Sequence, residues 1–362
     1  MAMSRAEQRQ KPLDLFAAMD AGYRETAASH WEIVMKNRFG LSDIKAAAER
    51  LRGKIVRTPL LTSPRLSKEA GCNLFVKAES LQRTGAFKYR GALNKMLLLD
   101  EAARRKGVLA YSSGNHGHAV AAAASAVGAR AVIVLPNTVA KIKVENCRWW
   151  NAEVVFYDPQ TEDRAEVGRA LLEERGMTLV SPFDDYDIIA GQGTCGLEIC
   201  EQIKDMDTAP DAVLINCSGG GLSSGVAEAV KSFFPEAQIY VVEPLGYNKM
   251  ARALVSGVPE KNPPFSKSVL DGILGPVVGQ RTLEILRRYD VKAKTISEDD
   301  ALHAMAVGFR DLKLVIEAGG AASLAAVLKN RAEFEGKNVV VIASGGNVDQ
   351  DVFALALRHL NA

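Results

Sequence analysis

The clearest candidate for chemistry in this sequence is Lys88, within the segment KAESLQRTGAFKYRGALN at residues 77–94. Leu93, Met96 and Leu97 follow it at helical spacing, so we expect a helix that begins close to Lys88. A helix N-terminus carries partial positive charge and disfavours an ammonium group, so an amine there is more easily neutral and nucleophilic. The pattern therefore predicts a nucleophilic amine, and the alternative is a solvated surface lysine.

A second segment, SGGG at residues 218–221, lies between an expected apolar strand and the start of an expected helix. Unsatisfied amides and the helix dipole favour a phosphate at such a place, and residues without side chains let the backbone approach it. The segment is not a P-loop, because no Lys-Ser or Lys-Thr pair follows. We therefore interpret it as an anion site of another kind.

A dinucleotide site is the alternative interpretation of this glycine segment. Gly219 and Gly221 have the first two spacings of the dinucleotide fingerprint, and Glu243, at the end of the next expected strand, could hold a ribose. The third position of the fingerprint is Ser224 instead of glycine. This alternative also leaves Lys88 unexplained.

Two further polar segments follow expected strands. SSGNHG at residues 112–117 precedes an alanine-rich helix, and its two hydroxyls, its asparagine and its exposed amides can converge on an anion. For Ser113 in isolation, a plain helix cap is the alternative. SGGN at residues 344–347 follows a buried strand expected at 339–343.

Taken in order, TGAFKYRGA, SSGNHG, SGGGL and SGGN resemble the motifs of the serine/threonine dehydratase and serine racemase family. These are fold-type II pyridoxal-phosphate enzymes, and the resemblance extends over roughly residues 44–362. It implies pyridoxal 5'-phosphate as cofactor, with Lys88 as the Schiff-base lysine. Cysteine-synthase relatives have a threonine-rich second motif, and His116 argues against that branch.

The resemblance also implies roles for individual residues. Lys88 and Ser113 would be catalytic, with Ser113 transferring a proton on the face of the cofactor opposite the lysine. The implied cofactor contacts are Phe87, Lys88, Asn115, Ser218, Gly219, Gly220, Gly221, Gly272, Glu317 and Ser344, the last hydrogen-bonding the pyridine nitrogen. The implied substrate contacts are Ser112, Ser113, Gly114, Asn115, His116 and Arg164. The alternatives are a core aromatic for Phe87, a surface carboxylate for Glu317 and a solvated helix-face arginine for Arg164.

Two positions depart from the family pattern. Ser218 stands where the family usually has glycine, and its hydroxyl would either donate to the phosphate or cap the following helix. Relatives with a divalent-cation site have acidic ligands at the position of Glu243 and six residues later, where this chain has Lys249. Because an ammonium repels a metal ion, we predict no divalent ion here and expect Lys249 to pair with Glu243.

Strands alternating with helices predict a doubly wound α/β architecture. We expect two parallel-sheet domains, the smaller inserted in the larger. Residues 44–106 and 185–362 would form a large cofactor-binding domain, and residues 107–184 a small substrate-binding domain. Residues 1–43 would be a helical extension, packed on the catalytic body or contributing to a subunit interface. Within the large domain, the residues from Gly191 to Thr194 are expected to open a helix.

Composition excludes several classes of protein. The 362 residues carry a net charge of +2, from 45 basic and 43 acidic residues, without a basic block, so nucleic acid is not an expected partner. No apolar run is long enough to span a membrane and the charged N-terminus does not resemble a signal peptide, so we expect a cytoplasmic protein. The five cysteines form no CxxC pair, which indicates neither a disulfide framework nor a zinc site.

The combined interpretation is a pyridoxal-phosphate-dependent ammonia-lyase that eliminates the β-hydroxyl of L-threonine or L-serine to give a 2-oxo acid and ammonia. Racemisation of serine, or dehydration of 3-hydroxyaspartate or another hydroxy amino acid at the same site, is the alternative. A non-catalytic amino-acid-binding protein is a further alternative from a different class. We expect a homodimer or homotetramer.

Overall fold

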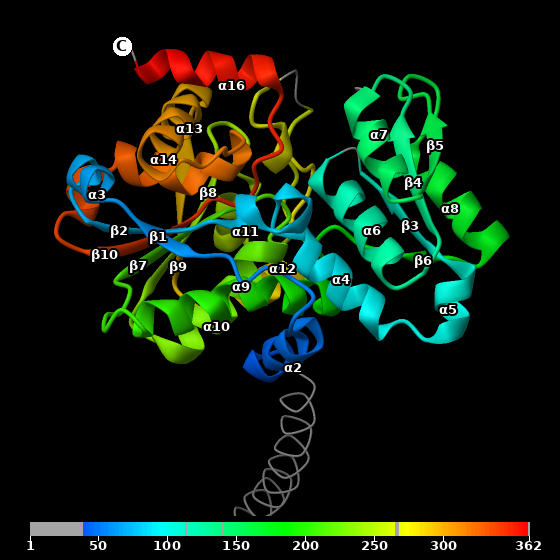
Figure 1. Cartoon of the computed structure of the whole chain (residues 1–362), viewed down its shortest axis with the longest axis horizontal. Coiled ribbons are helices and arrows are strands. Elements are labelled where there is room, and N and C mark those ends of the chain that lie inside the picture. Colours follow the sequence, from blue (N-terminus) through cyan, green and yellow to red (C-terminus); the bar gives the residue numbers. More distant parts are fainter. Residues whose placement is uncertain (1–38, 113, 140, 265–267, 361–362) are drawn as a thin grey trace, which may run out of the picture. The chain divides into compact units, whose positions relative to one another are not determined.

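The computed structural model describes residues 39–112, 114–139, 141–264 and 268–360, and the segment Leu41–Ala362 forms one compact unit. The helical extension expected at residues 1–43 lies almost wholly outside the described residues, and Ser113 also lies outside them. Within the compact unit, two β-sheets each have helices on both faces (Figure 1).

Six strands form the larger sheet in the order β1-β2-β10-β7-β8-β9. Neighbouring strands are parallel, except that β1 pairs antiparallel with β2. Because parallel strands end at the same edge, the segments that follow β7, β8 and β10 lie near one another. The bounds are β1 Leu60–Thr62, β2 Asn73–Lys77, β7 Ala212–Asn216, β8 Gln238–Pro244, β9 Val291–Ile296 and β10 Asn338–Ile342.

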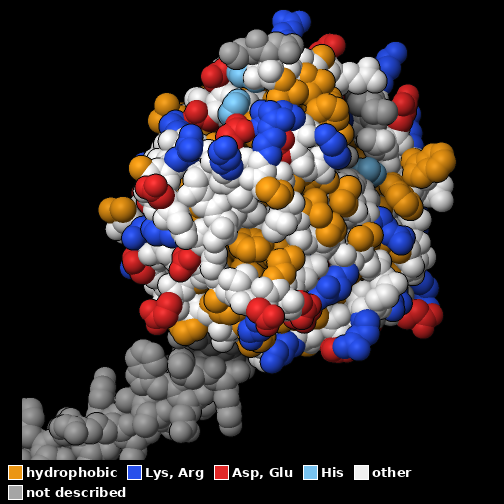
Figure 2. Space-filling view, turned by 60° about the vertical axis from the view of Figure 1, so that its left-hand side comes forward, with side chains coloured by type: hydrophobic (Ala, Val, Ile, Leu, Met, Phe, Trp, Pro, Cys, Tyr) orange, Lys and Arg blue, Asp and Glu red, His pale blue; other side chains and the backbone are white. Residues whose placement is uncertain are grey.

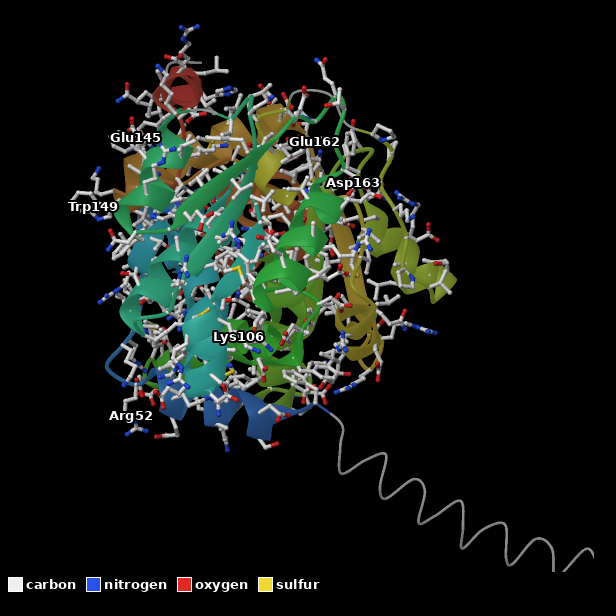
Figure 3. The ribbon with its side chains drawn as sticks, turned by 90° about the vertical axis from the view of Figure 1, so that its right-hand side faces the viewer. Arg52, Lys106, Glu145, Trp149, Glu162 and Asp163 are labelled. Carbon is white, nitrogen blue, oxygen red and sulfur yellow. The ribbon has the colours of Figure 1, made fainter. Side chains whose placement is uncertain are left out.

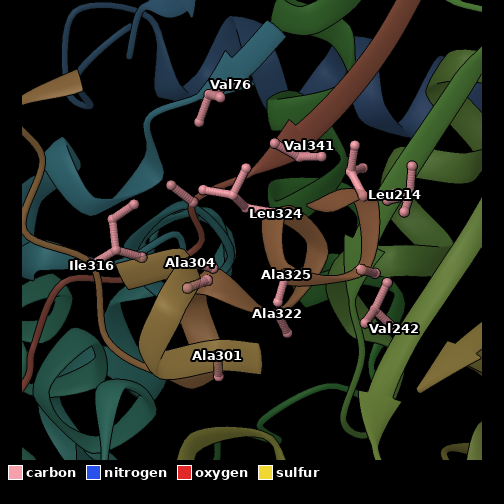
Figure 4. Close-up of a cluster of buried hydrophobic side chains, with 14 of the residues drawn as sticks. Val76, Leu214, Val242, Ala301, Ala304, Ile316, Ala322, Leu324, Ala325 and Val341 are labelled. Carbon is pink, nitrogen blue, oxygen red and sulfur yellow. The ribbon is translucent and has the colours of Figure 1, made fainter. Parts of the chain in front are cut away.

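Both faces of the larger sheet are apolar, which is why its strands are continuous apolar runs in the sequence. Val341 of β10 faces a core with α3, α13 and α14, where Figure 4 shows it near Leu324. Val340 and Ile342 face the opposite core, formed with α9, α10 and α12. The helices are α3 Pro64–Ala70, α9 Tyr186–Lys204, α10 Gly221–Phe233, α12 Gln280–Leu286, α13 Glu298–Leu312 and α14 Ala322–Lys329.

The smaller sheet has four parallel strands in the order β5-β4-β3-β6. Ile133 of β4 faces α6 and α7, whereas Val132 faces α8. On the outer face of this domain, α7 presents Trp149, whose exposed fraction is 81% (Figure 3). The bounds are β3 Val108–Tyr111, β4 Ala131–Pro136, β5 Glu153–Tyr157, β6 Thr178–Leu179, α6 Asn115–Ala126, α7 Lys141–Trp149 and α8 Arg164–Arg175.

The chain enters the smaller sheet from α4 (Lys88–Leu98) and α5 (Glu101–Lys106), and it returns to the larger sheet through α9. The predicted fold class is therefore confirmed: two doubly wound α/β domains, the smaller inserted in the larger.

The start expected for the helix at residues 191–194 is wrong. Helix α9 begins at Tyr186, where Asp185 accepts hydrogen bonds from the backbone N–H groups of Asp187 and Ile188. Gly191 lies inside the helix, and a Cβ there would be 2.6 Å from the Cα of Gly91 in α4. The glycines allow close helix–helix packing and do not mark a helix end.

Several short helices were not expected, because they lack a long apolar stripe. They are α3, α5, α11 Lys249–Ser256, α15 Arg331–Phe334 and α16 Gln350–Leu357. Helix α2 (Leu41–Leu51) was expected but begins three residues earlier than Ile44. The 3₁₀ segments are η1 Glu79–Leu81, η2 Arg83–Gly85, η3 Asp271–Ile273, η4 Gly319–Ala321 and η5 Arg358–Leu360.

The remaining sequence-wide features concern the cysteines, the apolar segments and the surface charges. All five cysteines are buried and free. In the described part of the chain, no helix has both the length and the apolar character needed to cross a bilayer. Lys and Arg side chains are interspersed with Asp and Glu side chains on the face shown in Figure 2.

Candidate active site

Lys88 is the first residue of α4, as the sequence predicts, and its side chain is partly buried. Its Nζ donates a hydrogen bond to the carbonyl oxygen of Pro182 at 2.6 Å and lies 5.2 Å from the centre of the Phe87 ring. Burial lowers the pKa of Lys88 to about 8. A substantial fraction of the amine is therefore neutral near physiological pH.

The start of α4 is held by the distant SGGN segment. The Phe87 N–H donates to the carbonyl oxygen of Ser344 at 3.0 Å, and the Gly346 N–H donates to the carbonyl oxygen of Gly85 at 2.8 Å. Ala86 and Gly345 form an antiparallel bridge between these contacts. The lysine and the residue expected to contact the pyridine nitrogen are thus brought to the same place by backbone pairing.

Ser344 is buried, and its hydroxyl is oriented by Asn216. Asn216 Nδ2 donates to Ser344 Oγ at 2.9 Å, and Asn216 Oδ1 in turn accepts the backbone N–H of Ser323 at 2.6 Å. Because Oγ accepts from Asn216, its own proton can be donated to an acceptor. Ser344 therefore offers a neutral hydrogen-bond donor.

Asn115 joins two parts of the site. Its Nδ2 donates to Glu317 Oε1 at 2.6 Å, and its Oδ1 accepts from Asn347 Nδ2 at 2.8 Å. Asn347 Nδ2 also donates to the carbonyl oxygen of Thr84 at 2.8 Å. Burial raises the pKa of Glu317 to about 7. Glu317 is consequently a partly buried carboxyl group of the site and not a surface carboxylate.

The SSGNHG segment lies at the N-terminus of α6, which begins at Asn115 after Gly114. Ser112 Oγ accepts the Gly114 N–H at 3.3 Å. The His116 ring is buried, and its Nε2 is 2.9 Å from the carbonyl oxygen of Val180, so Nε2 carries the proton. Burial, reinforced by Lys88, lowers the pKa of His116 to about 3, and the ring is neutral.

The glycine segment lies at the N-terminus of α10, where no side chain caps the first turn. Ser218 Oγ accepts the Gly275 N–H at 3.1 Å and therefore does not cap this helix. Gly220 has φ of 100°, and a Cβ there would be 2.6 Å from Thr282 Oγ1. The backbone amides of α10 are thus presented at the edge of the sheet where Ser344 also lies.

Gly272 lies close to a candidate site residue, whereas Arg164 is exposed on α8. A Cβ on Gly272 would be 4.0 Å from Glu317 Oε2, so Gly272 lies beside the carboxyl group. Arg164 is exposed at the first position of α8. The N-cap of this helix is Asp163, which is labelled in Figure 3. Within the described ranges, no hydrogen bond or ion pair connects Arg164 to the other candidate residues.

The expected pairing of Lys249 with Glu243 is present. Lys249 Nζ lies 3.8 Å from Glu243 Oε1, and both side chains are fully buried. The Glu243 carboxylate also accepts the N–H groups of Met250 at 3.0 Å and Ala251 at 2.9 Å. A buried carboxylate with these partners is not available to a ribose, which removes the basis of the dinucleotide alternative.

The chain matches the model of a known protein family. The family model described as pyridoxal-phosphate dependent enzyme matches residues 51–345. The chain belongs to this family. The resemblance inferred from the four motifs is thereby confirmed, and pyridoxal phosphate is the cofactor of this enzyme.

Three similar proteins illustrate the range of activities in the family. This enzyme is 39% identical to L-threo-3-hydroxyaspartate ammonia-lyase of Pseudomonas sp, over 87% of this chain and 98% of that protein. It is also 39% identical to serine racemase of Arabidopsis thaliana, over 84% of this chain and 92% of that protein. The solved structure of a threonine deaminase from T.th. is similar with a TM-score of 0.81 and 42% identity, over 86% and 99% of the two chains.

The residues present fit pyridoxal phosphate. Lys88 supplies a partly buried amine with a lowered pKa, which suits a covalent bond to an aldehyde. The uncapped N-terminus of α10 suits a phosphate, and the oriented Ser344 hydroxyl suits a ring nitrogen. The glycine segment packs closely against Phe183 and Thr282, where a Cβ on Gly219 or Gly220 would collide, so glycine is required at these two positions.

Several residues at the site are absent from the sequence-based set of candidates. Phe183 lies against Gly219, and its neighbour Pro182 accepts the hydrogen bond of Lys88. Thr282 Oγ1 donates to the carbonyl oxygen of Gly219 at 2.7 Å, and Asn347 contacts Asn115. Only Asn347 had a signal in the sequence, because it belongs to the SGGN motif; the others meet the site through tertiary packing.

Proposed function

We propose that this enzyme is an ammonia-lyase that removes the β-hydroxyl of a small β-hydroxy amino acid, L-serine or L-threonine, and yields a 2-oxo acid and ammonia. The observation that carries the proposal is the Lys88 amine, whose lowered pKa accompanies a hydrogen bond to Pro182 beside the neutral donor Ser344. The 42% identity to a threonine deaminase supports the same reaction class.

In the proposed site, Lys88 holds the cofactor covalently and the amides of residues 219–221, with Ser218, receive its phosphate. Ser344 donates to the pyridine nitrogen, and Asn115 and Glu317 lie on a polar side of the ring. When bound, the cofactor supplies an electron sink that makes the α-hydrogen of the substrate acidic. A serine donor would not enforce a charged ring, so the bound cofactor would supply a weak electron sink, which suits loss of a β-substituent.

Lys88 is the proposed base. In its neutral form, Nζ would take the α-proton of the bound substrate. The lowered pKa favours the neutral form that this step requires. The Pro182 carbonyl gives Nζ a fixed hydrogen-bond direction in the resting arrangement.

The N-terminus of α6 is the proposed site for the substrate carboxylate. Ser112, Ser113 and the first amides of α6 would bind it, supported by the helix dipole. The His116 ring contributes no charge, since it is neutral and bonded to Val180. We therefore assign to His116 a main-chain contact with the carboxylate and a structural role for its ring.

A second candidate substrate is L-threo-3-hydroxyaspartate. The relative from Pseudomonas sp that acts on it is covered over 98% of its length. In this chain, the cation of Arg164 is exposed at the carboxyl edge of the smaller sheet, the edge on which Ser112 also lies. That position suits contact with a second carboxylate.

The test measures release of 2-oxo acid by the purified enzyme loaded with pyridoxal phosphate. The substrates are L- and D-serine, L- and D-threonine, L- and D-allo-threonine and both 3-hydroxyaspartates. We expect fast turnover of L-serine or L-threonine and loss of turnover in Lys88→Ala. Turnover of 3-hydroxyaspartate alone, reduced in Arg164→Met, would establish the second candidate. If amino acids shift the visible band but no 2-oxo acid appears, the proposed elimination is refuted and racemisation should be assayed.

A further inference from the structure

Lys249 is one of the largest fully buried side chains of the protein, and the proposed reaction does not use it. Its Nζ has no hydrogen-bond partner within the described ranges and lies 3.8 Å from Glu243 Oε1. Taking an ammonium group out of water without hydrogen bonds is costly to stability. We therefore asked which neighbouring groups the Lys249 side chain holds in place.

The group that it holds is the Glu243 carboxylate. Burial raises the pKa of Glu243, whereas the Lys249 ammonium and the Met250 and Ala251 N–H groups act in the opposite direction. Those two N–H groups belong to the first turn of α11. Burial likewise lowers the pKa of Lys249, and the nearby Glu243 opposes that shift, so each group favours the charged form of the other. The carboxylate in turn accepts the N–H groups at the start of α11.

Helix α11 in turn contacts the glycine segment. A Cβ on Gly220 would lie 2.7 Å from Cε of Met250, so this methionine lies directly against the loop. On the other side, the Cys217 N–H donates to the carbonyl oxygen of Val242, the residue before Glu243, at 2.8 Å. The start of α11 and the end of β8 thus both contact the backbone around Gly220.

We propose that Lys249 is a positioning residue for the phosphate of the cofactor: its ammonium acts as a built-in cation that holds Glu243 and α11 against the glycine loop. The inference rests on the proposed phosphate-binding role of residues 218–221. It predicts that the enzyme needs no added divalent ion to bind its cofactor.

The experiment measures dissociation constants of pyridoxal phosphate and of pyridoxal for the apo form, because their ratio isolates the contribution of the phosphate. Lys249→Met should weaken the binding of pyridoxal phosphate by about tenfold and leave the binding of pyridoxal nearly unchanged. Lys292→Met, at an exposed position of β9, is the matched control and should keep the wild-type ratio. Lys249→Gln, which keeps a polar side chain, replaces the methionine variant if that variant does not fold.

A second variant tests the built-in cation directly. Lys249→Asp faces Glu243 with another carboxylate, and carboxylate oxygens are ligands that suit a divalent ion. We expect weak binding of pyridoxal phosphate that added Mg²⁺ restores, and no effect of Mg²⁺ or a chelator on the wild type.

Four outcomes would overturn these assignments, and they can be told apart. An equal loss of affinity for both ligands in Lys249→Met would indicate general destabilisation. Wild-type affinity for both ligands would show that Lys249 does not act on the loop. Failure of Mg²⁺ to restore Lys249→Asp would reject the built-in cation. If the wild type itself binds pyridoxal as tightly as pyridoxal phosphate, the phosphate-binding role of residues 218–221 fails instead.

Discussion

Asn115 donates a hydrogen bond to Glu317 at 2.6 Å, and this contact connects α6 of the smaller domain with the segment before α14 of the larger domain. The Asn115 amide is oriented at both ends, since its oxygen accepts from Asn347. Glu317 is thus a partly buried carboxyl group held by a fixed amide, and its raised pKa can be tested through the pH dependence of stability.

Replacing Glu317 by glutamine should flatten the pH dependence of stability. The pKa of Glu317 is raised in the folded protein from 4.5 to about 7, so the folded state binds more protons than the unfolded state between these values. Stability of the apo form should therefore fall as pH rises through this window. In Glu317→Gln, the loss of melting temperature between pH 5 and pH 8 should shrink by roughly 2–4 °C.

The exposed Glu335 provides the control for that experiment. Glu335→Gln should retain the wild-type pH dependence. An identical pH dependence in the wild type and Glu317→Gln would show that the carboxyl group does not titrate in this window.

The rate of cofactor uptake should depend on the fraction of the Lys88 amine that is neutral. Only the neutral amine attacks the aldehyde, and the pKa of Lys88 is lowered to about 8 by burial. The rate of appearance of the protein-bound visible band should rise with pH and level off above about 8. A rate that keeps rising toward the ordinary lysine pKa of about 10.4 would contradict an activated amine. Lys88→Ala should show no covalent band.

Asn347 is predicted to position Asn115. Its Nδ2 donates to Asn115 Oδ1 and to the Thr84 carbonyl oxygen, both at 2.8 Å. Asn347→Ala should lower kcat/KM by about tenfold, the worth of one or two hydrogen bonds, with a small change in melting temperature. Asn73→Ala removes a surface side-chain hydrogen bond to Asn338 and should leave kcat/KM unchanged. Equal activity of the two variants would reject the positioning role.

Arg90 forms a buried ion network with Glu79 and Glu198, and loss of this network should strongly reduce stability. Its guanidinium makes two hydrogen bonds to Glu79, both at 2.7 Å, and two to Glu198 at 2.7 and 2.8 Å. Arg90→Met leaves two carboxylates without this partner and should lower the free energy of unfolding by about 3–5 kcal/mol, measured by urea denaturation. Arg57→Met breaks an exposed ion pair with Glu201 and should change the free energy of unfolding by less than about 1 kcal/mol. Comparable losses in both variants would refute a special role for the buried network.

Local patterns in the sequence were sufficient for most of the architecture. Alternating apolar strands and helices predicted both sheets, because buried parallel strands must be apolar on both faces. The position of Lys88 in a first helical turn followed from the apolar spacing of Leu93 and Met96. The anion loops followed from glycine and hydroxyl residues at strand-to-helix transitions.

The start of α9 could not be predicted locally. Gly191 and Gly193 are ordinary helix-start signals in isolation, yet they lie inside the helix because α4 and α10 pack closely against it. The tight packing that explains them involves Gly91 and Gly225, residues that are distant in the sequence.

The sequence by itself determined which residue types follow each strand, and hence the candidate residues of each loop, and the resemblance of these motifs to a known family implied the cofactor class. Only the tertiary structure decided that Asn347 meets Asn115, that Pro182 receives the Lys88 amine and that Glu317 is shielded from water. The same holds for the complete burial of Lys249 beside Glu243. Burial and long-range hydrogen bonds depend on which elements pack together, and pKa values follow burial, so these properties are not encoded in any single stretch of the chain.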